Sequence, residues 1–390
     1  MCDSLKLAPM NKREFIRYCF LGAGGLVLGS HRLHGLSSYI DGGGALATAA
    51  QCPGKWSKEA LFYEQTEAGL KCLKCPNECV LGPNETGICR NRVNYDGKLY
   101  SIAYGNPCAV HIDPIEKKPL FHFLPSTKAF SIATAGCNLR CLNCQNFQIS
   151  QVGPNETENY DLMPKAVVDQ CLERHCKSIA YTYSEPTTFY EYTLDTSILA
   201  HERKIRNVLK SCGYVNELPL RKLSKHLDAA NIDLKSFEES IYRNLSQGHL
   251  APILNTLKTL KEEGVWLEIT NLVIPSWTDD LDMIKRMSEW LCENGLSDCP
   301  LHFSRFIPLY KLTQLPVTPV STLERARDIA LRAGVKFVYL GNVPGNPAEN
   351  TYCPKCKEMI VERKGFTILA NHIVGNTCAF CHEPIPGVWA

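Results

Sequence analysis

The chain has 390 residues, of which 45% are hydrophobic and 21% charged, values typical of a soluble globular protein with one large domain and smaller appendages. Its formal net charge is +2 and no run of Lys or Arg exceeds two residues, so nothing indicates a nucleic-acid partner. The 20 cysteines are unusually many, and most stand in C-x2-C or C-x3-C pairs, which favours metal ligation over disulfides.

Residues 1–55 read as a leader followed by a linker. Lys12 and Arg13 precede an apolar, glycine-rich run that ends near Gly29, and small residues follow at 45–50. This pattern resembles a twin-arginine export signal, and it is equally typical of an inert leader on a cytoplasmic enzyme. The run is too short and too rich in glycine for a spanning helix. We expect a cytoplasmic protein, with twin-arginine export as the alternative and membrane contact only through an uncleaved leader.

Residues 56–125 form a loop-rich module with the first set of cysteines. The stretch CLKCPNECVLGPNETGIC spaces them as C-x2-C-x3-C-x9-C, so four thiolates can close a metal site. Thiolates suit zinc and iron–sulfur clusters alike, and we expect structural zinc first and an auxiliary [4Fe–4S] cluster second. Unliganded thiols are the alternative, and Cys108 could replace one ligand. The expected ligands are Cys72, Cys75, Cys79 and Cys89.

Residues 126–345 alternate short β-branched or apolar runs with segments of helical period. Such alternation predicts parallel strands joined by crossover helices, in a closed or partial α/β barrel. A doubly wound open sheet is the competing architecture, but no G-x-G-x-x-G follows the first strand. We expect strands within 129–136, 178–185, 206–213, 228–236, 265–275, 301–308 and 336–343, and helices within 163–176, 240–264, 281–295 and 321–334.

The loop after the first of these strands carries the stretch GCNLRCLNCQN. In it, Cys137, Cys141 and Cys144 stand in a C-x3-C-x2-C pattern, and no further cysteine follows before Cys171. A ferredoxin-type carrier supplies four ligands, whereas three thiolates leave one iron of a cluster open. An open coordination position is what a catalytic centre needs. The loop therefore predicts a catalytic iron–sulfur site.

Residues 346–390 form a compact tail with a third cysteine set. The stretches TYCPKCKEM and GNTCAFCHEP give two C-x2-C knuckles separated by 21 residues. Four thiolates on two such knuckles close a tetrahedral site, so the spacing predicts a structural zinc ribbon. A ribbon that contacts nucleic acid is disfavoured because the flanks are not basic. The expected ligands are Cys353, Cys356, Cys378 and Cys381.

The first strand and its cysteine loop together resemble the radical S-adenosylmethionine (radical SAM) enzymes. Over roughly residues 60–389 the chain is similar to the radical enzymes of the AmmeMemoRadiSam system, which are relatives of the pyruvate formate-lyase activating enzyme. The resemblance implies a (β/α)6-type partial barrel, with a [4Fe–4S] cluster on the loop cysteines and S-adenosylmethionine on the open iron. It rests on the ordered motifs IATAGCNLRCLNCQN, YTYSEPT, NIDLKSF, EITNLVIP, SRFIPLYKLT and NVPGNPAENTYCPKC.

The resemblance also implies a reaction and the residues that hold its cofactor. One electron from a flavodoxin- or ferredoxin-like donor leads to a 5′-deoxyadenosyl radical, which removes hydrogen from a substrate. Tyr183, Ser184 and Glu185 stand where the superfamily has G-G-E, and Glu185 would bind the methionyl amino group. Asp233 and Lys235 match a D-L-K motif, in which Lys235 would pair with the methionyl carboxylate.

Asn271, in TNLVIP, is a further candidate for contact with the ribose or the carboxylate. Two of the expected contacts have simpler interpretations. Glu185 precedes Pro186 and could cap the helix that follows, and Lys235 could be a solvated charge at the end of a strand.

Two positions depart from the activating enzymes that the chain resembles. Those enzymes have Arg in the fifth strand, where this chain reads Glu268-Ile269-Thr270, and His after the sixth strand, where it has Tyr310. We therefore expect a radical enzyme that acts on a small molecule or a peptide. An activase for a glycyl-radical enzyme is the second hypothesis, and a non-catalytic zinc-ribbon binding protein the third. The family name implies Memo-type and AMMECR-type proteins as pathway partners.

Overall fold

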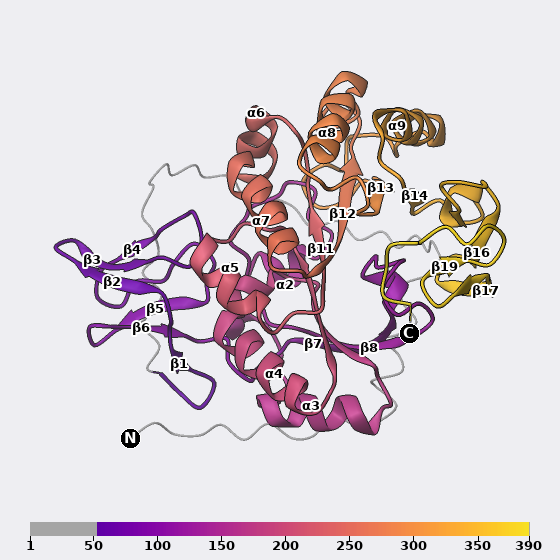
Figure 1. Cartoon of the computed structure of the whole chain (residues 1–390). Helices are drawn as coiled ribbons and strands as arrows, with labels where there is room; N and C mark the ends of the chain where they lie inside the picture. Colours follow the sequence, from indigo (N-terminus) through magenta and orange to yellow (C-terminus); the bar gives the residue numbers. More distant parts are fainter. Residues whose placement is uncertain (1–52, 390) are drawn as a thin grey trace, which may run out of the picture. The chain divides into compact units, whose positions relative to one another are not determined.

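An eight-stranded mixed sheet lies at the centre of residues 53–389, the part of the chain that the computed structural model describes (Figure 1). Seven strands pair in parallel and in chain order, without the reversal that defines a doubly wound sheet. This order is that of an open α/β barrel, as expected. The parallel strands are β8 Lys128–Ala133, β9 Ser178–Tyr181, β10 Arg206–Ser211, β11 Ala229–Asp233, β12 Trp266–Val273, β13 Leu301–Arg305 and β14 Val338–Gly341.

Helices follow the strands, and most of the longer ones bury one face. In α8, for example, the side chains at 283, 284, 287 and 291 are buried, which is the spacing of one helical face. Of the longer helices, α4 and α5 were not expected from the sequence. The helices are α2 Phe147–Ser150, α3 Pro164–Glu173, α4 Tyr190–Glu202, α5 Glu217–Ser224, α6 Glu239–Ile241, α7 Leu250–Glu262, α8 Leu281–Glu293 and α9 Val320–Ala333.

The single helix expected within 240–264 is broken into α6, a π-helical turn and α7. The cysteine loop causes the break, because the backbone N–H groups of Arg140 and Leu142 donate to carbonyls at 246 and 245 (2.9 and 2.8 Å). Gly248 follows the break, and a Cβ there would lie 2.6 Å from Leu139 Cδ2. The sequence period predicted the helix, but it could not show that this turn receives the loop.

A segment after strand β7 closes the amino-terminal end of the barrel. β7 Ala109–Pro114 pairs antiparallel with β8 and is one edge of the central sheet, with β14 at the other. Small apolar side chains of four parallel strands form a layer at this end, which we call the barrel floor. The segment after β7 packs against this layer. Residues 109–125 therefore belong to the barrel, not to the cysteine-rich module in which we placed them. The packed residues are Ile115, Leu120 and Phe123 on Ala129, Ala180, Val208 and Ala229.

The N-terminal module consists of two small antiparallel sheets around its own apolar cluster. One sheet has the order β1-β6-β5 and the other β2-β3-β4. The leader expected at residues 1–55 lies almost wholly outside the described residues. The strands are β1 Lys58–Glu59, β2 Tyr63–Thr66, β3 Gly69–Cys72, β4 Val80–Leu81, β5 Arg92–Tyr95 and β6 Lys98–Ser101.

The C-terminal tail forms a three-stranded sheet and a hairpin, coloured yellow in Figure 1. Among residues 53–389, no helix has both the length and the apolar character needed to cross a membrane. The strands of the tail are β15 Thr351–Tyr352, β16 Met359–Lys364, β17 Thr367–Asn371, β18 Ile373–Val374 and β19 Thr377–Cys378.

Candidate functional site

The cysteine loop leaves the carboxyl end of β8 and is fixed by hydrogen bonds within the loop and to α2. Gly136 N–H donates to the Ile149 carbonyl (2.8 Å), which closes the loop against α2, and Arg140 Nη1 donates to the Cys137 carbonyl (2.7 Å). Cys144 Sγ lies 3.0 Å from Ser150 Oγ, the last residue of α2. The loop therefore holds its three cysteines in place without a disulfide, and every cysteine of the described residues is free.

The chemistry of the three thiols fits metal ligation. Burial raises the pKa of Cys137 well above its ordinary value, and the Glu185 carboxylate raises it further. Burial also raises the pKa of Cys144. Buried thiols of this kind stay neutral on their own, whereas a bound cation deprotonates them. The sulfurs of Cys137 and Cys144 thus become anionic only when metal is present.

Glu185 bridges the ends of β9 and β10 beside this loop. Its Oε1 accepts hydrogen bonds from Thr187 N and Ser211 Oγ (3.1 and 2.8 Å), and its Oε2 accepts one from Cys212 N (2.8 Å). The first of these bonds caps the 3-10 turn Pro186–Phe189, so the capping interpretation is confirmed. The same carboxylate nevertheless faces Cys137, so a cap and a contact to a ligand on the loop are compatible.

Tyr183 and Ser184 tie the end of β9 to the neighbouring strand and loop. Ser184 Oγ donates to the Thr134 carbonyl (2.6 Å), and the Tyr183 carbonyl accepts from Asn146 Nδ2 (2.7 Å). Tyr183 has a φ of 63°, the left-handed region that glycine occupies most readily. This position is therefore one where a G-G-E sequence would place glycine, and here a tyrosine takes the same conformation.

Asp233 and Lys235 meet a third charged side chain, Lys210, at the ends of β10 and β11. Asp233 Oδ2 accepts from Lys235 Nζ (3.0 Å), and Asp233 Oδ1 accepts from Lys210 Nζ. Burial alone would raise the pKa of Asp233, but the two lysines lower it to about 2. Lys235 is also close enough to Cys141 for that sulfur to raise its pKa, so Lys235 is not a freely solvated charge.

Asn271 lies on the other face of β12 from the barrel interior. Glu268 and Thr270 point inward, where Thr270 Oγ1 donates to Asn231 Oδ1 (2.8 Å), and alternation along the strand directs Asn271 outward. Its Nδ2 donates to the Leu234 carbonyl (2.7 Å), next to Lys235. In this position Asn271 supports the D-L-K segment, and its predicted contact with the cofactor remains a prediction.

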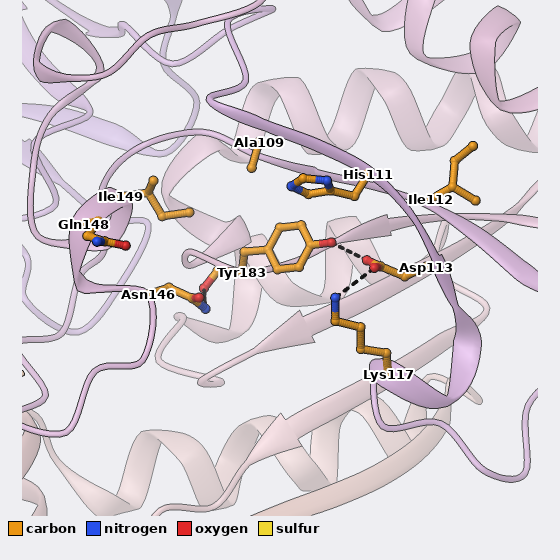
Figure 2. A pocket seen from close by; sticks show the side chains of 9 residues that line it. All are labelled: Ala109, His111, Ile112, Asp113, Lys117, Asn146, Gln148, Ile149 and Tyr183. Carbon is orange, nitrogen blue, oxygen red and sulfur yellow. Dashed lines mark hydrogen bonds and ion pairs between the residues drawn. The ribbon is translucent and has the colours of Figure 1, made fainter. Parts of the chain in front are cut away.

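A cavity of about 360 Å³ lies between β7, the start of α2 and Tyr183 (Figure 2). The Tyr183 hydroxyl donates to Asp113, whose other oxygen accepts from Lys117 Nζ (3.0 Å). Lys118 also binds Asp113, and burial lowers the pKa of Lys118 to about 8. Asn146, Gln148 and Ile149, which follow the cysteine loop in the chain, line one side of the cavity.

Comparison with known proteins agrees with this geometry. Residues 131–287 match the radical SAM superfamily. Over 331 residues, 84% of this chain and 98% of the relative, the chain is 43% identical to an uncharacterised protein of Methanocaldococcus jannaschii. The chain belongs to the radical SAM superfamily. It is also 24% identical to pyruvate formate-lyase 1-activating enzyme of Escherichia coli K12, over 52% of this chain and 89% of that enzyme.

Solved structures with a similar arrangement include a radical SAM methyltransferase from Sphaerobacter thermophilus. It is 14% identical with a TM-score of 0.44, and the match covers 56% of this chain and 67% of that one. A domain of a pyruvate formate-lyase-activating enzyme from Bacteroides vulgatus is 15% identical with a TM-score of 0.36, over 42% of this chain and 99% of that one.

Radical SAM proteins use a [4Fe–4S] cluster and S-adenosylmethionine, and their relatives receive single electrons from donors such as flavodoxin. The residues present here fit those groups. Cys137, Cys141 and Cys144 offer three soft ligands, and the loop has no fourth cysteine, so a bound cluster would have one iron open to the cofactor. Glu185 and Lys235 supply one negative and one positive charge beside it.

The structure adds site residues that our sequence analysis did not select. Lys210 and Ser211 close β10, and Asp113 comes from β7, a strand that we did not expect. The available signal was the polar run KSCG at the end of a strand, because barrel enzymes gather their chemistry at the carboxyl ends of strands. Asp113 gave no such signal, since its strand joins the sheet antiparallel and from outside the predicted barrel.

The cysteines of the tail meet at one point. Cys353 Sγ lies 3.6 Å from Cys381 Sγ, and Cys356 Sγ lies 3.8 Å from Cys378 Sγ. All four sulfurs lie within 4.8 Å of one another, so this group could hold a metal ion. The spacing of the two knuckles predicted this grouping.

Proposed function

We propose that this radical SAM protein cleaves S-adenosylmethionine reductively and uses the product radical to abstract hydrogen from a substrate bound in the 360 Å³ cavity. The observation that carries the proposal is the convergence of the three-cysteine loop, Glu185 and the Asp233–Lys235 pair at the carboxyl ends of β8, β9 and β11. When bound, the reduced cluster and S-adenosylmethionine supply a 5′-deoxyadenosyl radical.

The chain's own residues would bind and orient the cofactor. Glu185, already aligned by Ser211 and Cys212 N–H, would accept the methionyl amino group in a charge-assisted hydrogen bond. Lys235 would donate to the methionyl carboxylate, in exchange for part of its contact with Asp233. Lys210 would keep Asp233 ionised while this exchange occurs, because it remains paired with the other carboxylate oxygen.

Burial protects the site from water. Glu185 is 2% exposed, and Cys141 is 8% exposed. A low-dielectric site strengthens each of the charge interactions and keeps a reactive radical from solvent. The cavity beside the loop is of the size that small ligands occupy, about 300–1,000 Å³. This size supports a small molecule, or one side chain of a peptide, as substrate.

The reaction can be tested with the anaerobically purified full-length protein. Incubation with dithionite and S-adenosylmethionine should release 5′-deoxyadenosine and methionine, detected by liquid chromatography and mass spectrometry. With a fully loaded cluster, absence of both products would overturn the proposal. Protein that takes up zinc alone, without iron or sulfide, would favour the non-catalytic zinc-ribbon hypothesis instead.

Installation of a glycyl radical is the second proposed function, supported by the similarity to pyruvate formate-lyase activating enzymes. At the first departure from those enzymes, Glu268 is 0% exposed and accepts from the backbone N–H groups of Phe121 and His122 (3.0 and 2.7 Å). It also contacts His302 (2.7 Å), so its carboxylate binds groups at the closed end of the barrel. The second departure is Tyr310. Its ring stacks on Phe147 of α2, with the ring centroids 4.7 Å apart.

The proposal also covers the system to which the chain belongs, its partner proteins and its cellular compartment. We infer membership in the AmmeMemoRadiSam system, with Memo-type and AMMECR-type proteins as pathway partners, from the motifs quoted above. A flavodoxin- or ferredoxin-like protein is the proposed electron donor. The reduced thiols of three cysteine sets favour assembly in the cytoplasm, and twin-arginine export is the alternative. For the cysteine group of the tail we propose structural zinc.

A further inference from the structure

We propose that the N-terminal module holds a second iron–sulfur cluster, with four cysteine ligands and a buried lysine as its charge partner. The inference goes beyond the proposed function. It compares the spacing of the sulfurs in the N-terminal module with that in the radical SAM loop. Its test does not depend on turnover, so it can fail while the proposed function stands. The four ligands are Cys72, Cys75, Cys79 and Cys89.

Local structure brings the four cysteines together. Strands β3 and β4 form a hairpin in which Cys72 N–H donates to the Cys79 carbonyl (2.9 Å). Between them, Glu78 N–H donates to the Cys75 carbonyl (3.0 Å) and closes a tight turn. Cys89 follows in a buried loop, and Cys72, Cys75 and Cys89 are each 5% exposed. Three of the four thiols are therefore buried, and Cys79 is partly buried beside them.

The buried ammonium group of Lys74 points into this set. Lys74 is 0% exposed, and its Nζ lies 3.9 Å from Cys89 Sγ, its one hydrogen-bond partner among residues 53–389. A deeply buried ammonium without a counter-charge costs several kcal/mol, so Lys74 requires negative charge on the sulfurs around it. Four metal-bound thiolates carry a net negative charge and would supply the missing counter-charge. The position of the buried lysine beside Cys89, together with the burial of the set, supports a metal centre.

The spacing of the sulfurs in the N-terminal set favours a cluster over a single zinc ion. Around one Zn²⁺, a Zn–S bond of about 2.3 Å places tetrahedral sulfurs about 3.8 Å apart. The cysteine group of the tail has this spacing, at 3.6 and 3.8 Å. Within the described part of the chain, it is the one cysteine group whose sulfurs all lie within 4.8 Å of one another. No three sulfurs of the N-terminal set, or of the radical SAM loop, lie within 4.8 Å of one another, and a cluster in either place would take each thiolate on a different iron.

The N-terminal set packs directly on the radical SAM loop. A Cβ on Gly136 would lie 2.5 Å from the Cys89 carbonyl oxygen, so the residue before Cys137 touches the residue that supplies the fourth ligand. Asn77 Nδ2 donates to the Asn138 carbonyl (2.8 Å) from the same side. The second cluster would therefore adjoin the first through a backbone contact.

Metal analysis of a loop variant tests the proposal. Full-length protein with Cys137→Ala, Cys141→Ala and Cys144→Ala cannot hold the first cluster. After anaerobic iron and sulfide reconstitution, we expect it to retain about four irons and four sulfides, with roughly one zinc. Its reduced electron paramagnetic resonance signal should not change when S-adenosylmethionine is added. A variant with roughly two zinc ions and no iron, or with no metal beyond the tail, would overturn the proposal.

The lysine provides a second measurement in the same loop variant. Removal of a positive charge beside a cluster disfavours its reduced form, so Lys74→Met should retain iron and lower the midpoint potential of the cluster. Lys98→Met, an exposed position of the same module paired with Glu59, is the matched control and should leave the potential unchanged. An equal potential in both variants would overturn the role of Lys74. If Lys74→Met does not fold, the metal content of the loop variant still decides the proposal.

Discussion

Arg92 and Glu191 form a two-pronged ion pair, with Nη1–Oε2 at 2.7 Å and Nη2–Oε1 at 3.0 Å, and their side chains are 1% and 0% exposed. The pair joins strand β5 of the N-terminal module to helix α4 of the barrel. Glu191 also accepts from Leu61 N–H (2.8 Å), so a single carboxylate holds two segments of the module. The pair therefore anchors the N-terminal module on helix α4 of the barrel.

Loss of one partner of this pair should destabilise the protein strongly. Arg92→Met leaves the Glu191 carboxylate buried and unpaired, and we expect the free energy of unfolding to fall by about 3–5 kcal/mol. Chemical denaturation measures it. The exposed control Lys98→Met should cost less than about 1 kcal/mol. The double variant Arg92→Met/Glu191→Met should recover much of the loss, and no recovery would show that burial of the lone charge is not the cause.

Gly136→Ala should separate the module from the cysteine loop. Gly136 has a φ of 101°, and its added Cβ would lie 2.5 Å from Asn91 Oδ1 and from the Cys89 carbonyl oxygen, a backbone atom that cannot rotate away. We expect a lower iron content after reconstitution. Gly97→Ala is the control, since its φ is 73° and its surroundings are open, so it carries the strain without the clash. Equal iron in both variants would refute the contact as the cause.

Cys141→Ala should remove the proposed catalytic cluster and leave the proposed zinc of the tail cysteine group in place. The expected result is complete loss of 5′-deoxyadenosine formation, with zinc content unchanged by metal analysis. Cys292→Ala, on the outer helix α8, is the matched control and should keep full activity. Activity in Cys141→Ala would contradict the assignment of the three ligands.

Lys235→Met should weaken the binding of S-adenosylmethionine without loss of the cluster. A charge-assisted hydrogen bond is worth about 1.5–3 kcal/mol, so the affinity should fall about 10- to 100-fold. The change that S-adenosylmethionine causes in the electron paramagnetic resonance spectrum of the reduced cluster gives the titration. Lys258→Met, exposed on α7, should bind as the unmodified protein does. Unchanged affinity in Lys235→Met would rule out its pairing with the methionyl carboxylate.

His122 should make stability depend on pH below neutrality. Burial lowers its pKa from 6.5 to about 4, where Nε2 contacts the Tyr339 hydroxyl (2.6 Å) and Nδ1 contacts the Pro386 carbonyl (2.7 Å). Between these pKa values the unfolded chain binds more protons than the folded one, so stability falls as the pH decreases from 6.5 towards 4. The loss should approach about 3 kcal/mol at the lower limit.

The pH dependence can be followed as the melting temperature between pH 7.5 and 5.5. His122→Gln should flatten the curve over this interval, whereas His175→Gln, at an exposed position, should not. If both variants retain the slope of the unmodified protein, another group is responsible.

The sequence alone predicted what depends on local spacing. The alternation of strands and helices, the three-cysteine loop after β8 and the two knuckles of the tail are all read from neighbours along the chain, because backbone period and ligand geometry act over a few residues. Glu185 and Lys235 were selected by the same motifs, and the structure places both beside the loop.

Tertiary structure decided the contacts between segments far apart in the chain. Asn91 Nδ2 donates to the Ala135 carbonyl (2.8 Å), and Asp113 meets Tyr183 across the edge of the sheet. The break before α7 likewise follows from the loop that packs there. Such pairs bury polar groups whose partners only the folded chain supplies, and no local pattern specifies them. The sequence therefore determined which residues we propose as cofactor ligands, and the fold decided which residues hold them in place.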